Sequence, residues 1–318
     1  MTVHHLEASK ETVRVGVIDA AFEPVLAIDS GDEVVFDTWQ LWGDAVTPDS
    51  DFHHVLSLRQ AFKGKGPHSI TGPIRINGAQ PGMALRVDVL ELRLRDYGFN
   101  VLLPKGVGRG LLKDEIDGGE IRHFKLDRDT MTTQLGDKAT VQLRPFLGIM
   151  GVAPAVATPH ISSVPGEFGG NMDCSELVEG TSLLLPVWVD GALFYAGDAH
   201  AAQGHGELNQ TALESAFELV RLRITLLPQM TLPRPRILTA THVVTMGFHE
   251  NLHEAARQAT RDMIDLLVNE HGMTKQDAYV LCSLQVDLVI TQIVNGNNGV
   301  HARLPRHVLA SLSLDPQP

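Results

Sequence analysis

The stretch LLLPVWVDGALFYA, residues 183–196, carries the clearest local structure in the sequence. Two apolar runs flank the pair Asp190-Gly191, and an Asp-Gly pair between such runs is typical of a two-residue hairpin, because a type I′ turn needs positive φ at both central residues. A hairpin returns its second strand to the start of its first strand. The sequence therefore predicts that the segment after Ala196 lies close to the segment before Ser182.

Both of these flanking segments are rich in glycine and in polar side chains. The upstream segment is PGEFGGNMD (165–173), and the downstream segment is GDAHAAQGHGE (197–207). Asp198 and His200 are two positions apart, so their side chains would share one face of an extended strand. Carboxylate and imidazole groups at this spacing suit a divalent ion, and the glycines let the backbone approach a ligand closely. The alternative is a solvated loop that caps a following helix.

The composition is that of a folded, soluble protein: 318 residues, 43% hydrophobic and 20% charged. With 26 basic and 38 acidic side chains the net charge is −12, which argues against nucleic acid as a partner. No apolar stretch approaches the ~20 residues that a membrane helix needs, so we expect a cytoplasmic protein without a membrane partner. Only Cys174 and Cys282 are present, so any metal would be held by histidines and carboxylates.

Short runs of alternating apolar and polar residues fill the first half of the chain, as in strands with one buried face. We expect strands within 12–39, at 72–76, at 84–94 and at 139–143. The polar, Gly-rich segment 40–72 is too long for a simple connection, which predicts a functional loop or a lid.

Helical periodicity is confined to the second half. Apolar side chains that recur every three or four residues predict helices over 212–226 and 252–271. Gly272 supplies a C-terminal stop for the second of these, and Thr274 begins a near-capping box that opens a third helix.

The order of these elements predicts a β-rich α+β fold. It would comprise an N-terminal β-sandwich-like half, a central hairpin or small barrel, and a C-terminal α+β part with helices packed on a sheet. We expect a β-rich N-terminal domain at 1–144, a central β region with the functional site at 145–235, and the α+β part at 236–318. The proline-rich stretch 232–235 marks the last boundary.

A literal H-E-x-x-H motif runs from His249 to His253. In zinc proteases this motif lies on a helix and needs a third ligand elsewhere. The next carboxylate downstream, Glu270, would lie on the same helix about 25 Å away at ~1.5 Å per residue. We therefore rank a zinc protease last and expect a polar helix start, with Glu250 near the positive end of the helix dipole.

Two other reactive residue types are interpreted as unreactive. Cys174 could be a nucleophile, but its neighbours Asp173 and Glu176 would raise its pKa, which favours a buried, small apolar side chain. The pair His53-His54 in the long polar segment is expected to be exposed to solvent rather than to bind metal.

Four longer blocks occur in a fixed order: ITGPIRINGAQPGMALRVDVLEL (70–92), PFLGIMGVAPA (145–155), VPGEFGGNMDC (164–174) and LLLPVWVDGALFYAGDAHAAQGHGE (183–207). Together they resemble the acetamidase/formamidase family of linear amide hydrolases. The resemblance covers most of the chain and is far more specific than a five-residue motif. One position departs from the family pattern, because His205 stands where the form G-D-G-E has Asp.

The resemblance implies hydrolysis of a short carboxamide to carboxylate and ammonia, by a homodimer or higher homo-oligomer with a divalent metal near the Asp/His cluster. The expected metal ligands are Asp173, Asp198 and His200. Ligation by histidine and carboxylate fits zinc, which we favour, while ligation dominated by oxygen fits calcium or magnesium. Glu207 would act as general base toward water and then protonate the departing amine. Asn171 and Gln203 are expected to bind the substrate carboxamide.

The main alternative is a β-rich protein that binds a small molecule and whose metal site is purely structural. The sequence does not distinguish formamide from acetamide or from a longer amide, because a pocket discriminates a single methyl group by only ~1–3 kcal/mol.

Overall fold

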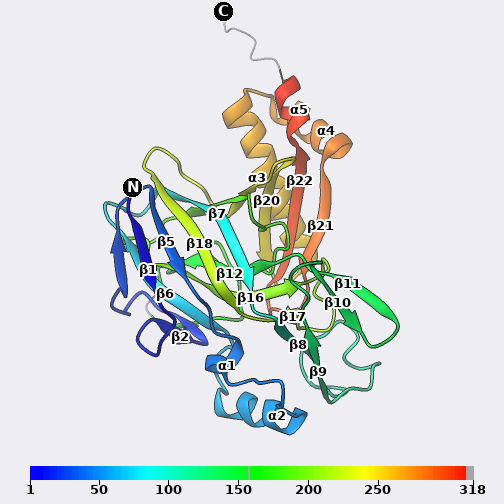
Figure 1. Ribbon diagram of the computed structural model, residues 1–318. Helices are drawn as coiled ribbons and strands as arrows, with labels where there is room; N and C mark the ends of the chain where they lie inside the picture. Colours follow the sequence, from blue (N-terminus) through cyan, green and yellow to red (C-terminus); the bar gives the residue numbers. More distant parts are fainter. Residues whose placement is uncertain (157, 313–318) are drawn as a thin grey trace, which may run out of the picture.

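Two nine-stranded sheets form the body of the protein within residues 1–156 and 158–312, the part that the computed structural model describes (Figure 1). Strands greatly outnumber helices, which confirms the β-rich α+β class predicted from the sequence. In the described part of the chain, no helix is both long enough and apolar enough to cross a membrane.

The first sheet joins strands from both ends of the chain. Its order is β1 (Val3–Leu6), β5 (Asp32–Phe36), β18 (Phe217–Leu227), β7 (Ala84–Leu94), β15 (Ser182–Pro186), β19 (Arg236–Leu238), β20 (His242–His249), β22 (Asn298–Pro305) and β21 (Asp287–Gln292). All neighbours are antiparallel except β1 and β5. This sheet takes strands from all three expected segments, whose boundaries at 144 and 235 stay a prediction.

The second sheet is the one that carries the site. Its order is β14 (Gly169–Asn171), β12 (Phe146–Val152), β16 (Phe194–Ala202), β17 (Leu213–Glu214), β8 (Tyr97–Leu102) and β9 (Glu120–Lys125). Off this path, β6 (Ser69–Ile76) pairs with β16, β2 (Val13–Val15) and β4 (Leu26–Ile28). Two small ribbons pair β10 (Thr132–Leu135) with β11 (Ala139–Gln142) and β3 (Val17–Ile18) with β13 (His160–Ile161).

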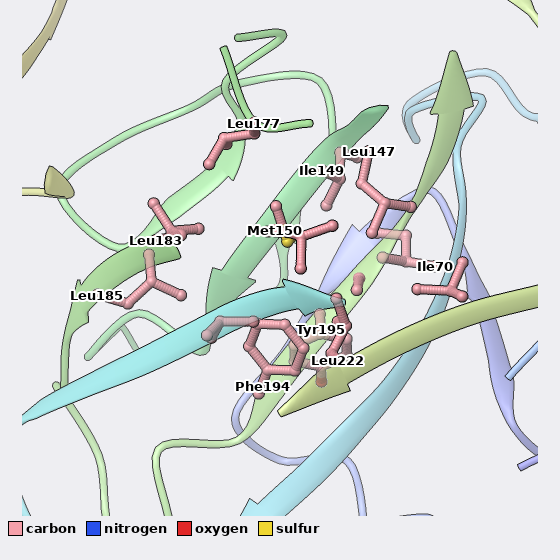
Figure 2. Close-up of a cluster of buried hydrophobic side chains, with 14 of the residues drawn as sticks. Ile70, Leu147, Ile149, Met150, Leu177, Leu183, Leu185, Phe194, Tyr195 and Leu222 are labelled. Carbon is pink, nitrogen blue, oxygen red and sulfur yellow. The ribbon is translucent and has the colours of Figure 1, made fainter. Parts of the chain in front are cut away.

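The main core lies between the two sheets. Leu183, Leu185 and Leu222 from the first sheet pack in one cluster with Ile149 and Phe194 from the second (Figure 2). All five side chains are fully buried. Each contributes roughly 1.5–3 kcal/mol relative to an exposed side chain, so the facing sheets hold β12 and β16 firmly in place.

The C-terminal helices are placed as the sequence predicts. α3 (Leu252–His271) matches the expected range and packs on β20 and β22. Gly272 ends it with φ 68°, and the Thr274 side chain caps α4 (Lys275–Gln285) by accepting a hydrogen bond from the Asp277 backbone N–H at 3.1 Å. A short helix, α5 (Arg306–Ser311), follows β22.

The predicted hairpin at Asp190-Gly191 is wrong. A turn does form there, with the Ala192 backbone N–H donating to the Val189 carbonyl at 3.0 Å. The strands on either side of it belong to different sheets, because β15 pairs with β7 and β19 while β16 pairs with β12, β6 and β17. Left-handed backbone at Gly191, Ala192 and Leu193 redirects the chain from one sheet to the other.

The predicted helix over 212–226 is also wrong, because this segment forms β17 and most of β18. A register shift between Phe217 and Leu219 adds one residue to the strand, so Phe217 and Val220 are both buried although they are three positions apart. That bulge imitates helical spacing in the sequence.

The long loop expected over 40–72 contains two helices, α1 (Leu41–Asp44) and α2 (Phe52–Ala61). The Asp51 side chain caps α2 by accepting a hydrogen bond from the His54 backbone N–H at 2.8 Å. His53 and His54 are exposed, as predicted. In Figure 1 both helices lie at the bottom of the view, at the opposite end of the molecule from α4 and α5.

Candidate active site

The strands β14, β12 and β16 bring together the two segments that the sequence singled out. Strand β12 is paired on both sides, with Ile149 opposite Asn171 in β14 and opposite Gly197 in β16. Asp173 lies two residues after β14, and Asp198 lies within β16. The predicted convergence is therefore real, but it comes from a shared central strand and not from a hairpin.

His200 lies at the centre of a buried group of carboxylates, called here the carboxylate cluster: Asp173, Asp198, His200, Glu207 and Glu214. The His200 Nδ1 is 3.6 Å from Asp173 Oδ1, and its Nε2 is 3.4 Å from Asp198 Oδ2 and 3.3 Å from Glu214 Oε2. All five residues are at most 6% exposed and line one cavity of about 560 Å³. Among the described residues no lysine or arginine nitrogen lies within 4.0 Å of these carboxylates.

Three members of the carboxylate cluster adopt left-handed backbone. The φ angles are 48° at Asp173, 60° at Asp198 and 50° at Glu207. A residue with a Cβ rarely adopts this conformation, which costs about 1–3 kcal/mol and is found most often at functional sites. The fold therefore maintains strain at the place where the acidic side chains converge.

The cluster has the features of a site for a cation. Several of its buried atoms have no hydrogen-bond partner within the described chain: Asp173 Oδ1, Asp198 Oδ1, His200 Nδ1 and Glu207 Oε2. Gly148 leaves the space between them open, since a Cβ there would lie 2.5 Å from Asp173 Oδ1 and 2.6 Å from Asp198 Oδ2. Buried polar atoms are normally paired, so Asp173, Asp198 and His200 can hold a metal ion.

The pKa values reflect this crowding. Burial raises the pKa of Asp173 to about 7, and burial together with the nearby Asp173 raises the pKa of Glu207 well above its usual range. Burial also acts to raise the pKa of Asp198, but His200 and His68 together lower it below its usual range. Burial lowers the pKa of His200, and the Asp198 and Glu214 carboxylates raise it well above its usual range. Burial and the neighbouring carboxylates therefore favour the neutral form of Glu207.

Three residues that the sequence did not single out complete the site. Glu214 lies on β17, in the segment whose spacing imitated a helix. The Asn295 Nδ2 donates to Asp173 Oδ2 at 2.5 Å, and the His68 Nε2 is 3.9 Å from Asp198 Oδ2. No local sequence pattern connects these three residues with the segment 165–207. Their residue types were therefore the only sign in the sequence that they could belong to the site.

The two expected substrate-binding residues are placed differently. Asn171 lines the same cavity as the carboxylate cluster, and its buried Oδ1 has no hydrogen-bond partner in the described chain. Gln203 lines a separate cavity of about 610 Å³, and its Nε2 donates to the Asp173 carbonyl oxygen at 3.0 Å. The structure therefore brings Asn171, but not Gln203, into the cavity of the carboxylate cluster.

A second group of potential ligands, called here the Glu176 cluster, comprises Glu176, His205 and His301. The His205 Nε2 is 3.6 Å from Glu176 Oε1. Two arginines flank the same carboxylate, with an Arg303 nitrogen 3.6 Å from Oε1 and an Arg144 nitrogen 3.7 Å from Oε2. The nearby His205 ring and the charges of the two arginines lower the pKa of Glu176 to about 2. The chain itself compensates the negative charge here.

The H-E-x-x-H motif is divided between two elements. His249 ends β20, and Asn251 caps α3, so the five residues do not share one helix. Glu270 accepts a hydrogen bond from the Arg236 Nη1 at 2.6 Å. Neither His249 nor His253 belongs to a group of potential ligands in the described part of the chain. These placements agree with the low rank given to a protease.

Cys174 is fully buried, and burial raises the pKa of its thiol to about 12. A thiol with so high a pKa is almost entirely protonated near neutral pH, and the thiolate is the nucleophilic form. The structure therefore confirms the interpretation of Cys174 as a small apolar side chain.

Taken together, the two-sheet fold and the carboxylate cluster define a β-rich protein with a buried candidate metal centre. The model of the Acetamidase/Formamidase family matches residues 18–163 and 155–310. The chain therefore belongs to the Acetamidase/Formamidase family, as the sequence blocks indicate.

Individual relatives support this placement. The chain is 27% identical to the acetamidase of Mycolicibacterium smegmatis in an alignment 199 residues long, which covers 45% of this chain and 49% of that protein. It is 27% identical to the formamidase of Methylophilus methylotrophus in an alignment 191 residues long, which covers 44% of this chain and 47% of the relative. These matches span about half the length of the two relatives. The crystal structure of an acetamidase from Bacillus halodurans superposes with a TM-score of 0.88 at 29% identity, covering 98% of this chain and all of that one.

Proposed function

We propose that this protein hydrolyses the C–N bond of a linear carboxamide and releases a carboxylate and ammonia. The observation that carries the proposal is the carboxylate cluster, with four buried acidic side chains around His200 and, among the described residues, no lysine or arginine nitrogen within 4.0 Å of them. Membership of the Acetamidase/Formamidase family supports the reaction class. The similar proteins include an acetamidase and a formamidase, so acetamide and formamide are both reasonable first substrates to test.

Asp173, Asp198 and His200 would hold a divalent ion. Histidine and carboxylate ligands favour zinc, and a larger share of oxygen ligands would favour calcium or magnesium. When bound, such an ion supplies a Lewis acid that polarises the amide carbonyl and lowers the pKa of nearby water. The Asn295 side chain, which donates to Asp173 Oδ2, fixes the orientation of one ligand.

Glu207 is the proposed general base and general acid. Its raised pKa and its unpaired Oε2 suit a carboxylate that accepts a proton from the attacking water. The same group then delivers this proton to the departing nitrogen, so that the amine leaves as a neutral molecule. The free Oδ1 of Asn171 would accept a hydrogen bond from the substrate N–H₂ and orient the amide.

Ammonia release from formamide and acetamide, measured with and without a chelator, tests the proposal. We expect Glu207→Gln to keep its metal and to lose about 10²–10⁴ in rate, the usual contribution of acid–base catalysis. The control is Glu250→Gln, which removes the glutamate of the H-E-x-x-H motif. It should change neither the metal content nor the rate of ammonia release. Full activity in Glu207→Gln would refute the assignment of the base. Metal binding without hydrolysis of any amide would favour the alternative of a structural metal in a binding protein.

We also propose that the protein assembles as a homodimer or higher homo-oligomer. The edge strand β21 and the neighbouring helix α4 expose large apolar side chains: Tyr279, Val280, Leu284, Leu288 and Ile290. Such a group of side chains on one edge commonly marks an interface. Sedimentation analysis of the wild type and of Leu284→Glu would test this, and a monomeric wild type would refute it.

A further inference from the structure

The cavity that contains the carboxylate cluster is large for its proposed substrate. Its volume of about 560 Å³ lies within the roughly 300–1,000 Å³ of pockets that enclose molecules of drug size. Formamide and acetamide have only a few heavy atoms and would fill a small part of this space. The remaining volume can receive another part of a larger amide.

The cavity has two regions of opposite charge. The carboxylate cluster forms the buried region. Four cationic residues form the other region, called here the cationic rim: Arg59, Lys63, Lys65 and Arg109. The rim residues are half-buried or exposed, so they mark the end that is open to solvent. Arg59 lies on α2, Lys63 and Lys65 follow it, and Arg109 comes from the loop between β8 and β9.

The cationic rim has no anionic partner in the described part of the chain. Among the described residues, none of its four side chains makes an ion pair within 4.0 Å or a side-chain hydrogen bond. Burial, together with the nearby charge of Arg109, lowers the pKa of the Arg59 guanidinium. Unpaired cations that repel one another are stabilised when an anion binds between them.

We propose that the natural substrate is an amide that also carries an anionic group, such as a carboxylate, which the cationic rim binds while the amide lies against the carboxylate cluster. The anion would orient the substrate, because the opposite charges of the two regions favour only one direction of entry. This inference rests on the proposed amide hydrolysis and adds to it a substrate class.

Kinetic comparison of charged and neutral amides tests the inference. The monoamides of succinic and glutaric acid carry a carboxylate, and the corresponding diamides are neutral and of nearly equal size. We expect kcat/KM for the better monoamide to exceed that of its diamide at least tenfold, since a hydrogen bond to a charged group is typically worth this much. The preference should weaken as the salt concentration rises, because salt screens the exposed rim.

Substitutions in the cationic rim then test whether the rim causes the preference for the monoamide. Arg59→Gln and Arg109→Gln should each reduce the preference for the monoamide about tenfold or more. The matched control is Lys105→Gln, which removes a cation from the same loop as Arg109 but from outside the cavity. It should leave the preference unchanged. A preference that is equally strong in all three variants would overturn the assignment to the cationic rim.

Two further outcomes separate this inference from the proposed function. If diamides or acetamide are hydrolysed at least as well as monoamides, the inference is overturned and amide hydrolysis stands. If no amide is hydrolysed, the proposed function fails. Calorimetric titration with glutarate then shows whether the cationic rim binds an anion. Glutarate binding that weakens tenfold in Arg59→Gln supports an anion site there, whereas unchanged or absent binding contradicts it.

Discussion

The carboxylate cluster and the Glu176 cluster contain the same kinds of side chain, but their charge balance differs. Around His200, four buried carboxylates have no lysine or arginine within 4.0 Å among the described residues, and the pKa values of Asp173 and Glu207 are raised. In the Glu176 cluster, one carboxylate is shared by two arginines, and its pKa is lowered to about 2.

The difference in charge balance gives a criterion for choosing between the two possible metal sites. A cluster that the chain has neutralised with its own cations is already stable, and a metal ion entering it would be repelled by the arginines. A cluster with uncompensated buried charge needs a counterion, because burying unpaired charges is very costly. The carboxylate cluster is therefore the better candidate for binding a metal, and each prediction below compares the two clusters directly.

The largest expected difference concerns the removal of one carboxylate charge from each cluster. Asp198→Asn should lose the metal and about a thousandfold in kcat, because Lewis-acid catalysis is worth several kcal/mol. Glu176→Gln should keep its metal, and its activity per folded molecule should stay within tenfold of the wild type. Metal analysis and ammonia release on both variants make the comparison, and equal losses would remove the distinction between the clusters.

Glycine substitutions near the two clusters should differ by a smaller factor. Gly148→Ala would place a Cβ 2.5–2.7 Å from Asp173, Asp198 and His200, so the ligands must shift, and misplacement of this kind can cost about 10² in rate. Gly204→Ala, beside His205, adds a Cβ with no atom within 4 Å and should be tolerated. Metal content and kcat of both variants would show this, and an active Gly148→Ala protein would argue against the site.

Metal removal should destabilise the protein through one cluster only. A ligand present at 100 times its Kd stabilises the folded state by about 2.7 kcal/mol, so chelation should lower the Tm of a chain of this length by roughly 4 °C. The same shift is expected for Glu176→Gln, and no shift is expected for Asp198→Asn. Calorimetric scans with and without chelator measure it, and a shift that depends on Glu176 would reverse the assignment.

The smallest expected effect is a pH dependence at the Glu176 cluster. The folded pKa of Glu176, about 2, lies below its unfolded value of about 4.3, so its ionised form stabilises the fold above the unfolded pKa. This contribution, about 1 kcal/mol after solvent screening, is lost as the pH falls from about 5 to about 2. Urea titrations across this range should show a shallower slope of stability against pH for Glu176→Gln. An unchanged slope would mean that the arginines do not stabilise the carboxylate.

The sequence predicts the fold well where the signal is local. The range of α3 follows from its apolar stripe and from Gly272, and both are confirmed. Prediction fails where strand pairing is decided by distant partners. The turn at Asp190 exists, yet nothing near it specifies that β15 and β16 enter different sheets. The bulge at β18 similarly depends on its pairing with β7, and without that context its spacing resembles a helix.

For the site, the sequence brings the right segments together for an incorrect reason. Asp173, Asp198 and His200 do form one group, because β12 pairs with strands on both sides of it. Asn295 contacts Asp173 from 122 positions along the chain, so no spacing rule could have found it. Charge balance was also beyond the sequence, because the arginines that neutralise Glu176 lie far from it along the chain.

The most direct test of the central claim is an element-specific anomalous diffraction map of the purified protein, recorded above and below the absorption edge of the metal that its X-ray fluorescence reveals. The charge balance predicts a strong anomalous peak between Asp173, Asp198 and His200, and none at the Glu176 cluster. A peak at the Glu176 cluster, with none between Asp173, Asp198 and His200, would contradict it.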